Sequence, residues 1–151
     1  MARKTRIAAR QVVEVIPLVM RTLALEMRST GYLLAPVHCP LMVMLAEGPH
    51  NLSELAETQA VSLPTMSNSI SALVERGWVT RVRDPHDRRM VLVELTPAGR
   101  AVLGEVKRSV EGRVGRLLAS LSPAECDQLL TGLEVLRGCF SRPADRAQSS
   151  E

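Results

Sequence analysis

The chain has 151 residues and a mass of 16.5 kDa, the length of one ordinary domain with enough sequence for a sizeable hydrophobic core. Hydrophobic residues make up 46% and charged residues 23%, a composition that excludes disordered, collagen-like and disulfide-framework proteins. Aromatic residues make up only 2%, which excludes nucleic-acid binding by rows of base-stacking rings. The net charge of +3 and the pI near 9.1 permit a polyanionic partner but do not require one.

The three cysteines, Cys39, Cys126 and Cys139, are odd in number and widely spaced, which fits neither a secreted disulfide framework nor a zinc site. No apolar run reaches the roughly 18 residues of a membrane span, and the basic segment 2–6 is not followed by a signal-peptide core. We therefore expect a cytoplasmic protein that has no membrane partner. The sequence also lacks a glycine-rich phosphate loop, a nucleophile elbow and a metal-spaced carboxylate and histidine cluster, so we expect no enzymatic activity, cofactor or metal.

The first predicted element is a long helix near the start of the chain. Apolar residues recur at intervals of three and four over residues 10–29, which predicts one long helix that stops at Gly31. Pro17 predicts a kink there, or a second helix start with Pro17 in its first turn. A shorter helix is predicted from Pro36 to Ala46, closed by Gly48 and Pro49. Its expected inward residues are Val37, Leu41, Met44 and Leu45.

Residues 50–78 form the most informative pattern, because two short helical segments are separated by a tight turn at residues 59–61. Ser62 is the predicted N-cap of the second segment, Pro64 lies in its first turn and Gly77 ends it. One face of this segment is apolar, and the opposite face carries small hydrogen-bonding side chains. This arrangement is typical of a helix-turn-helix. The apolar face is Met66, Ile70, Leu73 and Val74, and the polar face is Thr65, Ser67, Asn68 and Ser71.

Two strand-like runs follow, at residues 78–83 and 90–95, and the turn residues between them predict a β-hairpin. The residues expected in the interior of the two strands are Val79, Val82, Val91 and Val93. Thr96 and Pro97 begin a long helix that reaches Leu117. A capping box at residues 122–125 begins a last helix, and residues 141–151 have the composition of a flexible tail. One side of the last helix carries Leu129, Leu133, Leu136 and Phe140.

The string Asp84-Pro85-His86-Asp87-Arg88-Arg89, six residues before Leu95-Thr96-Pro97-Ala98-Gly99, resembles the wing signature of MarR-type transcriptional regulators. The stretch from Leu73 to Val79 also resembles this family's exit from the second motif helix into the wing, and the likeness covers roughly residues 10–140 in order and length. It implies a mainly α fold with a small β-hairpin, in which a winged helix-turn-helix is flanked by long dimerisation helices. The chain departs from the family pattern at Ala60, where such turns often carry glycine, and at Pro17.

The resemblance divides the chain into an N-terminal dimerisation helix (1–34), a winged helix-turn-helix (35–99), C-terminal dimerisation helices (100–140) and a tail (141–151). It implies a homodimer in which Arg89 enters the DNA minor groove and the Asp87 carboxylate holds its guanidinium. Arg81, Arg83 and Arg88 are expected to contact phosphates, which position a protein without reading the sequence. The remaining candidate DNA contacts are Ser62, Pro64, Thr65, Ser67, Asn68 and Ser71, and the alternative for them is an ordinary polar helix surface.

A cavity for a small-molecule effector is also typical of similar regulators, and Met20, Met27, Met42 and Met44 are candidates to line it. Core packing is the favoured explanation of these methionines, because methionine fills irregular gaps anywhere in a protein. Tyr32 and His38 are the polar candidates beside it. The sequence therefore predicts a ligand-responsive repressor that binds double-stranded DNA as a homodimer on a pseudo-palindromic operator. The alternatives are a winged-helix module for protein contacts only, and a redox sensor that uses a cysteine such as Cys39.

Overall fold

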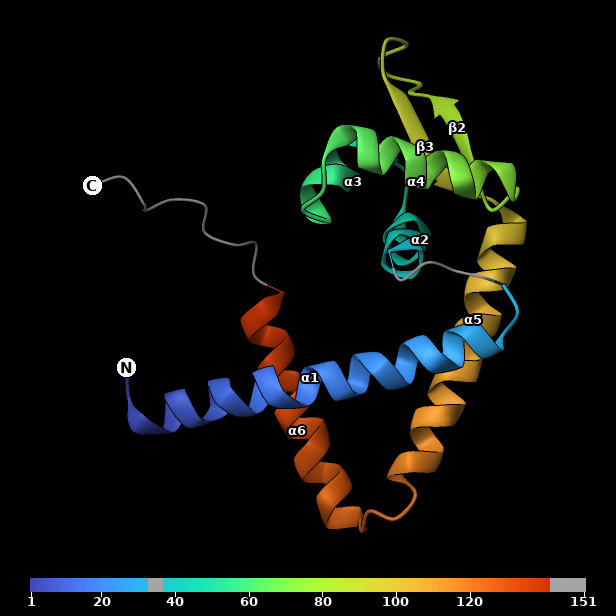
Figure 1. The fold of residues 1–151 in the computed structure, drawn as a ribbon. Coiled ribbons are helices and arrows are strands. Elements are labelled where there is room, and N and C mark those ends of the chain that lie inside the picture. The colour runs from blue at the N-terminus through green and yellow to red at the C-terminus, as the bar shows by residue number, and fades with distance from the viewer. Residues whose placement is uncertain (33–36, 142–151) are drawn as a thin grey trace. The chain divides into compact units, whose positions relative to one another are not determined.

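The structure, a computed structural model, describes residues 1–32 and 37–141, and its main compact unit covers Met1–Arg113. In chain order this unit contains helix α1 (Arg3–Ser29), α2 (His38–Glu47), strand β1 (His50–Asn51), α3 (Leu52–Thr58) and α4 (Leu63–Glu75). Strands β2 (Val79–Arg83) and β3 (Val91–Leu95) follow, and then most of α5 (Pro97–Leu118) (Figure 1). The predicted fold class, a mainly helical winged helix-turn-helix, is confirmed. The predicted helix start at Pro36 and the tail from residue 142 lie outside the described residues.

The first helix differs from its prediction at two places. It begins at Arg3 and not at residue 10, and it continues through Pro17 without a second start. Pro17 lies in the second half of a 27-residue helix, so the hydrogen bonds on either side hold the backbone while one donor is lost. The end of the helix agrees with the prediction, since Gly31 follows it with a φ of 79°, which favours glycine.

The helix-turn-helix forms where the caps and the turn predicted it. Asn51 begins α3 with a capping box that includes Glu54, and the Ser62 hydroxyl accepts a hydrogen bond from the backbone N–H of Thr65 at the start of α4. Between the two helices Ala60 adopts a φ of 53°, the left-handed conformation for which many such turns use glycine. The turn therefore keeps its usual geometry at a small conformational cost.

The sheet has three antiparallel strands in the order β1-β3-β2, one strand more than predicted. The short β1 pairs His50 with Val93, and β2 pairs Val79 with Leu95 and Arg83 with Val91. Val91 is half exposed, so its predicted place in the strand interior is wrong; Val79, Val93 and Leu95 are the buried residues. Successive side chains of β2 and β3 point to opposite faces of the sheet. The buried positions lie at the start of β2 and in the second half of β3, which is the half of the hairpin nearer to the helices.

One hydrophobic core holds these elements together. It is formed by Leu41, Met42 and Leu45 of α2, Leu55 and Ala56 of α3, Met66, Ile70 and Leu73 of α4, the buried strand residues, and Val102, Leu103 and Val106 of α5. Met42 is fully buried, so its predicted role as a cavity-lining residue is replaced by a role in the core. No side chain of α1 is fully buried, although the structure describes the whole helix.

The second compact unit, residues 114–151, contains the end of α5 and α6 (Pro123–Phe140). Helix α6 begins with the predicted capping box, in which Ser122 and Glu125 exchange hydrogen bonds. None of its described residues is fully buried. Apolar side chains therefore lie open along this helix, namely Leu129, Leu130, Leu133, Val135 and Phe140.

Candidate nucleic-acid interface and nearby pocket

The outer face of α4 is built by its N-cap. Ser62 Oγ accepts from the Thr65 backbone N–H at 3.2 Å and lies 2.8 Å from Thr65 Oγ1. Pro64, Thr65 and Asn68 are exposed, and Ser67 and Ser71 are half-buried. The hydroxyl and amide groups of this face can donate to and accept from base edges or phosphates. The sequence predicted this division of α4, because the same helix turns Met66, Ile70 and Leu73 toward the core.

The first wing strand is tied to this face by one hydrogen bond. Arg81 Nη2 donates to Ser71 Oγ at 3.0 Å, which joins β2 to the middle of α4. Further out, Arg83 Nη1 donates to the carbonyl oxygen of Arg88 at 3.4 Å across the base of the loop. Both arginines are exposed, so their guanidinium groups extend positive charge from α4 along the wing.

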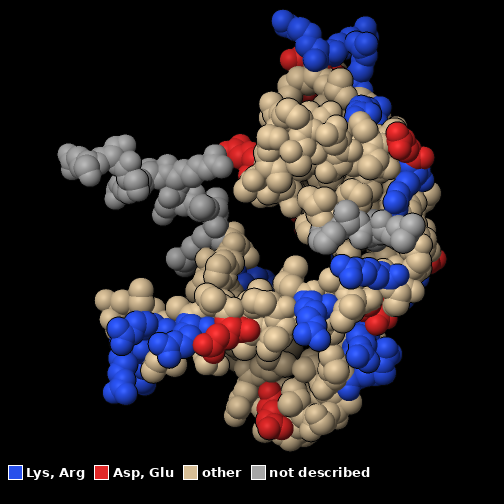
Figure 2. Space-filling view, viewed as in Figure 1, with Lys and Arg blue, Asp and Glu red and all other residues tan. Residues whose placement is uncertain are grey.

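At the tip of the wing, one carboxylate organises the segment that bears Arg89. Asp87 Oδ1 accepts a hydrogen bond from the backbone N–H of Arg89 at 3.0 Å and lies 3.6 Å from Arg89 Nε. The Arg89 side chain is 96% exposed. On the other side of the loop, Asp84 Oδ1 accepts from the His86 backbone N–H at 2.8 Å. The family resemblance implied the pairing of Asp87 with Arg89, and Figure 2 shows basic side chains gathered at this tip.

The geometry gives this surface a defined chemistry. Arginine is planar and more weakly hydrated than lysine, and it binds phosphates or enters a narrow groove well. The exposed wing cations and the small polar face of α4 lie on neighbouring elements joined through Ser71 and Arg81. The arrangement can therefore offer both backbone contacts and base-edge contacts to one polyanion.

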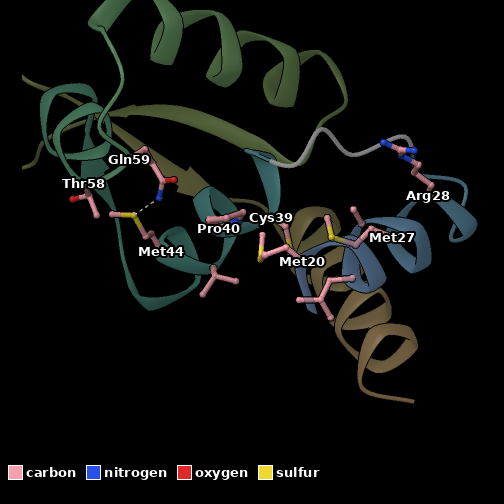
Figure 3. A pocket seen from close by; sticks show the side chains of 11 residues that line it. Met20, Met27, Arg28, Cys39, Pro40, Met44, Thr58 and Gln59 are labelled. Atoms are coloured by element: carbon pink, nitrogen blue, oxygen red, sulfur yellow. Dashed lines mark hydrogen bonds between the residues drawn. The ribbon is translucent and has the colours of Figure 1, made fainter. Parts of the chain in front are cut away.

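A pocket of about 450 Å³ lies within the same compact unit, between α1, α2 and the C-terminal end of α3 (Figure 3). Of the predicted lining residues, Met20, Met27 and Met44 line it. Tyr32, His38 and Met42 are not among its lining residues. Sequence reasoning missed the contribution of α3, whose Thr58 and Gln59 close one side; Gln59 Nε2 lies 3.4 Å from Met44 Sδ. The other lining residues are Leu23, Ala24, Arg28, Cys39, Pro40 and Val43.

The titratable groups around this pocket are not activated for chemistry. Burial raises the pKa of the Cys39 thiol, and the nearby Lys107 charge opposes this only in part. Burial and then the charge of Arg76 lower the pKa of His38, which is therefore neutral at physiological pH. Within the described residues, His, Cys, Asp and Glu side chains form no group that could hold a metal ion. None of the described helices has an apolar stretch that could cross a bilayer.

Comparison with known proteins agrees with this architecture. The family model described as MarR family matches residues 41–91, from the start of α2 to the wing. An HTH-type transcriptional regulator of Bacillus subtilis, YpoP, is 36% identical over 63 residues, which cover 42% of this chain and 45% of that protein. The multiple antibiotic resistance protein MarR of Salmonella typhimurium is 39% identical over 49 residues, which cover 32% of this chain and 34% of that protein. The matched region thus spans less than half the length of these two relatives.

The likeness to solved structures extends further along the chain. The crystal structure of RV1404 from Mycobacterium tuberculosis superposes with a TM-score of 0.83 and covers 97% of this chain and 100% of that one. Its sequence identity is 22%, so this likeness concerns the fold. The family match lies on the helix-turn-helix and the wing, where the side chains described above are found. The helix-turn-helix and wing of this chain, within residues 41–91, are similar to those of the MarR family of transcriptional regulators.

Proposed function

We propose that this protein is a sequence-specific transcriptional regulator that binds double-stranded DNA as a homodimer on a pseudo-palindromic operator. The observation that supports DNA binding most directly is the wing tip, where Asp87 holds the backbone N–H of Arg89 and lies beside its guanidinium. A guanidinium held at the end of a wing can enter the minor groove while α4 lies in the adjacent major groove. The function needs binding only and has no catalytic step.

The exposed apolar helices support the homodimer. In a single chain, α1 leaves Val13, Leu18 and Leu25 more than half exposed, and α6 does the same with Leu130 and Phe140. Soluble proteins rarely leave so many apolar side chains on neighbouring turns in water, so they mark a surface that a partner covers. Because the two recognition helices of a dimer must reach successive major grooves about 34 Å apart, a change in their separation would lower DNA affinity. This provides a route to release of a repressor.

The small polar face of α4 favours DNA over a protein partner. A winged helix that contacts only proteins would expose an apolar or acidic face on this helix, whereas α4 exposes Thr65 and Asn68. A cysteine redox sensor is disfavoured by the half-buried Cys39, because burial raises the pKa of its thiol and reduces the reactive thiolate. Operator binding therefore remains the function that these side chains support best.

The first test compares two cations of the same chain. Arg89→Ala should weaken operator binding by about 1–3 kcal/mol, because a groove contact is lost. Lys107→Ala also removes one positive charge, but Lys107 is an exposed residue of α5 outside the wing, so its effect should be limited to a screened field. Affinities for an operator selected from random duplexes, measured at one salt concentration, decide the matter. Equal losses for the two variants would contradict a groove contact.

The role of Asp87 can be separated from its charge by a second comparison. Asp87→Ala and Asp84→Ala each remove one negative charge from the same loop, and each removes a side chain that accepts from a backbone N–H. Charge alone would make both variants bind every duplex more tightly. If Asp87 orients Arg89, only Asp87→Ala loses specific affinity while its nonspecific binding stays equal or rises. Equal tightening of both variants on operator and scrambled duplexes would rule out this role.

We also propose that the pocket beside α1 holds the effector of a ligand-responsive repressor. Its lining is almost wholly apolar, with three methionines, and Arg28, Thr58 and Gln59 supply its few polar groups. Pockets of this kind favour apolar ligands with one or two polar atoms. Thr58 and Gln59 end α3 directly before the turn of the helix-turn-helix, so an occupant would contact the elements that position α4.

A neutral aromatic alcohol, 1-naphthol, is a suitable probe of this pocket. We expect it to raise the melting temperature of the unchanged protein, since a ligand that binds only the folded state stabilises it. Ala24→Phe should fill part of the cavity and abolish the shift, whereas Ala101→Phe, at an exposed position of α5, should keep it. A shift that persists in Ala24→Phe would place the binding elsewhere.

A further inference from the structure

Two of the three aromatic residues of the chain meet at the C-terminal end of α4. The rings of Tyr32 and Trp78 lie edge to face, with centroids 5.9 Å apart and planes at 79°. The guanidinium carbon of Arg76 lies 4.9 Å from the centroid of the Trp78 ring. These distances fit an aromatic pair and a cation–π contact. Tyr32 follows α1 and Trp78 precedes β2, so the contact joins parts of the chain that are far apart in sequence.

Hydrogen bonds extend this contact to a third element. Arg76, the C-cap residue of α4, donates through Nη1 to the carbonyl oxygen of Tyr32 at 2.5 Å. The Tyr32 hydroxyl donates to a carboxylate oxygen of Glu105 in α5. This hydrogen bond raises the pKa of Tyr32, so the hydroxyl stays protonated and remains a donor. We refer to Tyr32, Arg76, Trp78 and Glu105 as the Tyr32 cluster.

The Tyr32 cluster connects the C-terminal end of α4 to other helices. It lies at the end of α4 opposite to the N-cap, so it fixes the end of the helix that the Ser62 cap does not hold. Ser109 of α5 donates to Glu26 of α1 at 2.7 Å, which ties the same two helices together beside the cluster. Through Tyr32, the end of α4 is therefore connected to a joined pair, α1 and α5.

We infer that the Tyr32 cluster sets the position of α4 relative to α1 and α5, and that Arg76 and Tyr32 are positioning residues for DNA binding. This inference rests on the proposed function. In a dimer held together by the long helices, the attachment of α4 to those helices determines the distance between the two recognition helices. The repeat of the major groove, about 34 Å, leaves little tolerance for a change in that distance, so the cluster fixes which half-site spacing the protein accepts.

The experiment measures this spacing preference directly. An operator is selected from random duplexes by the unchanged protein, and two further duplexes are made with one base pair inserted or removed between the half-sites. We expect Arg76→Gln to reduce the affinity ratio between the selected and altered spacings by about fivefold, since it removes a charge-assisted hydrogen bond and a cation–π contact. Tyr32→Phe, which keeps both Arg76 contacts but loses the link to Glu105, should reduce the ratio less.

Arg100→Gln is the matched control. Arg100 is also an exposed arginine, and its Nη1 donates to the backbone carbonyl of Ala46 at 3.4 Å. The Arg100→Gln variant therefore loses the same charge and the same kind of hydrogen bond, but away from the Tyr32 cluster. Its spacing ratio should equal that of the unchanged protein. If Arg76→Gln weakens binding to all three duplexes by one common factor, Arg76 acts as a phosphate contact and the inference is wrong.

The outcomes also separate this inference from the proposed function. A protein that selects no duplex overturns both. A protein that selects an operator, with an Arg76→Gln variant that keeps the spacing ratio, overturns only the positioning role. If Arg76→Gln loses its cooperative melting transition, the spacing ratio of Tyr32→Phe tests the inference instead. This variant removes one exposed hydroxyl and leaves the two rings and Arg76 in place, and an unchanged spacing ratio would then overturn the positioning role.

Discussion

Leu133→Glu should convert the protein from a dimer to a monomer and weaken operator binding by more than about a hundredfold. Leu133 is 49% exposed on α6, in line with Leu129 and Phe140, where the proposed partner subunit would cover it. An unpaired carboxylate buried in such an interface costs about 3–5 kcal/mol, and a symmetric dimer contains two of them. A monomer can occupy only one half-site, so most of the operator affinity is lost with the dimer.

Thr131→Glu provides the control for this substitution. It adds the same charge to the same helix at an exposed position on the opposite side from Leu133, since two residues span about 200° of a helix. Light scattering at micromolar concentration should give a dimeric mass for the unchanged protein and for Thr131→Glu, and a monomeric mass for Leu133→Glu. A dimeric Leu133→Glu protein would show that the α6 face is not the interface.

The elements that could be predicted from the sequence are those with strong local signals. Ser62, Ser122 and Thr96 are caps whose hydroxyls satisfy backbone donors within three residues, so their roles depend little on the rest of the fold. The division of α4 into an apolar and a polar face follows from its helical period. The pairing of Asp87 with Arg89 spans two residues and was given by the family resemblance.

The features that could not be predicted depend on distant partners. Strand β1 has two residues and exists because His50 and Asn51 pair with β3 across some forty residues of chain. The pocket combines one face of α1 with α2 and the C-terminal end of α3, and periodicity cannot show which apolar residues of those faces stay uncovered. The role of Tyr32 in the cluster could not be predicted either, because its partners Arg76 and Glu105 lie 44 and 73 residues away in the sequence.

Gly99→Ala should destabilise the fold by about 3 kcal/mol, at the upper end of the usual cost of overpacking. A Cβ atom at Gly99 would lie 2.0 Å from the carbonyl oxygen of Trp78 and 2.8 Å from its carbonyl carbon. That carbonyl cannot easily move, because it accepts the backbone N–H of Thr96 at 3.0 Å where β2 and β3 meet. The Thr96 side chain adds to the constraint, since its Oγ1 accepts from Gly99 N and donates to the carbonyl of Gly77.

Gly104→Ala, in the same helix, should stabilise the fold. A Cβ atom there would meet only the end of the Arg108 side chain at 3.9 Å, so alanine fits and should stabilise α5 by about 0.5–1 kcal/mol through its lower conformational entropy in the unfolded chain. Melting temperatures at one protein concentration, compared with that of the unchanged protein, test both substitutions. Because Gly99 joins α5 to the start of the wing, its substitution should also lower operator affinity, whereas Gly104→Ala should leave it unchanged. A Gly99→Ala protein as stable as Gly104→Ala would mean that the start of α5 can move away from Trp78, and the wing would then not be held by this contact.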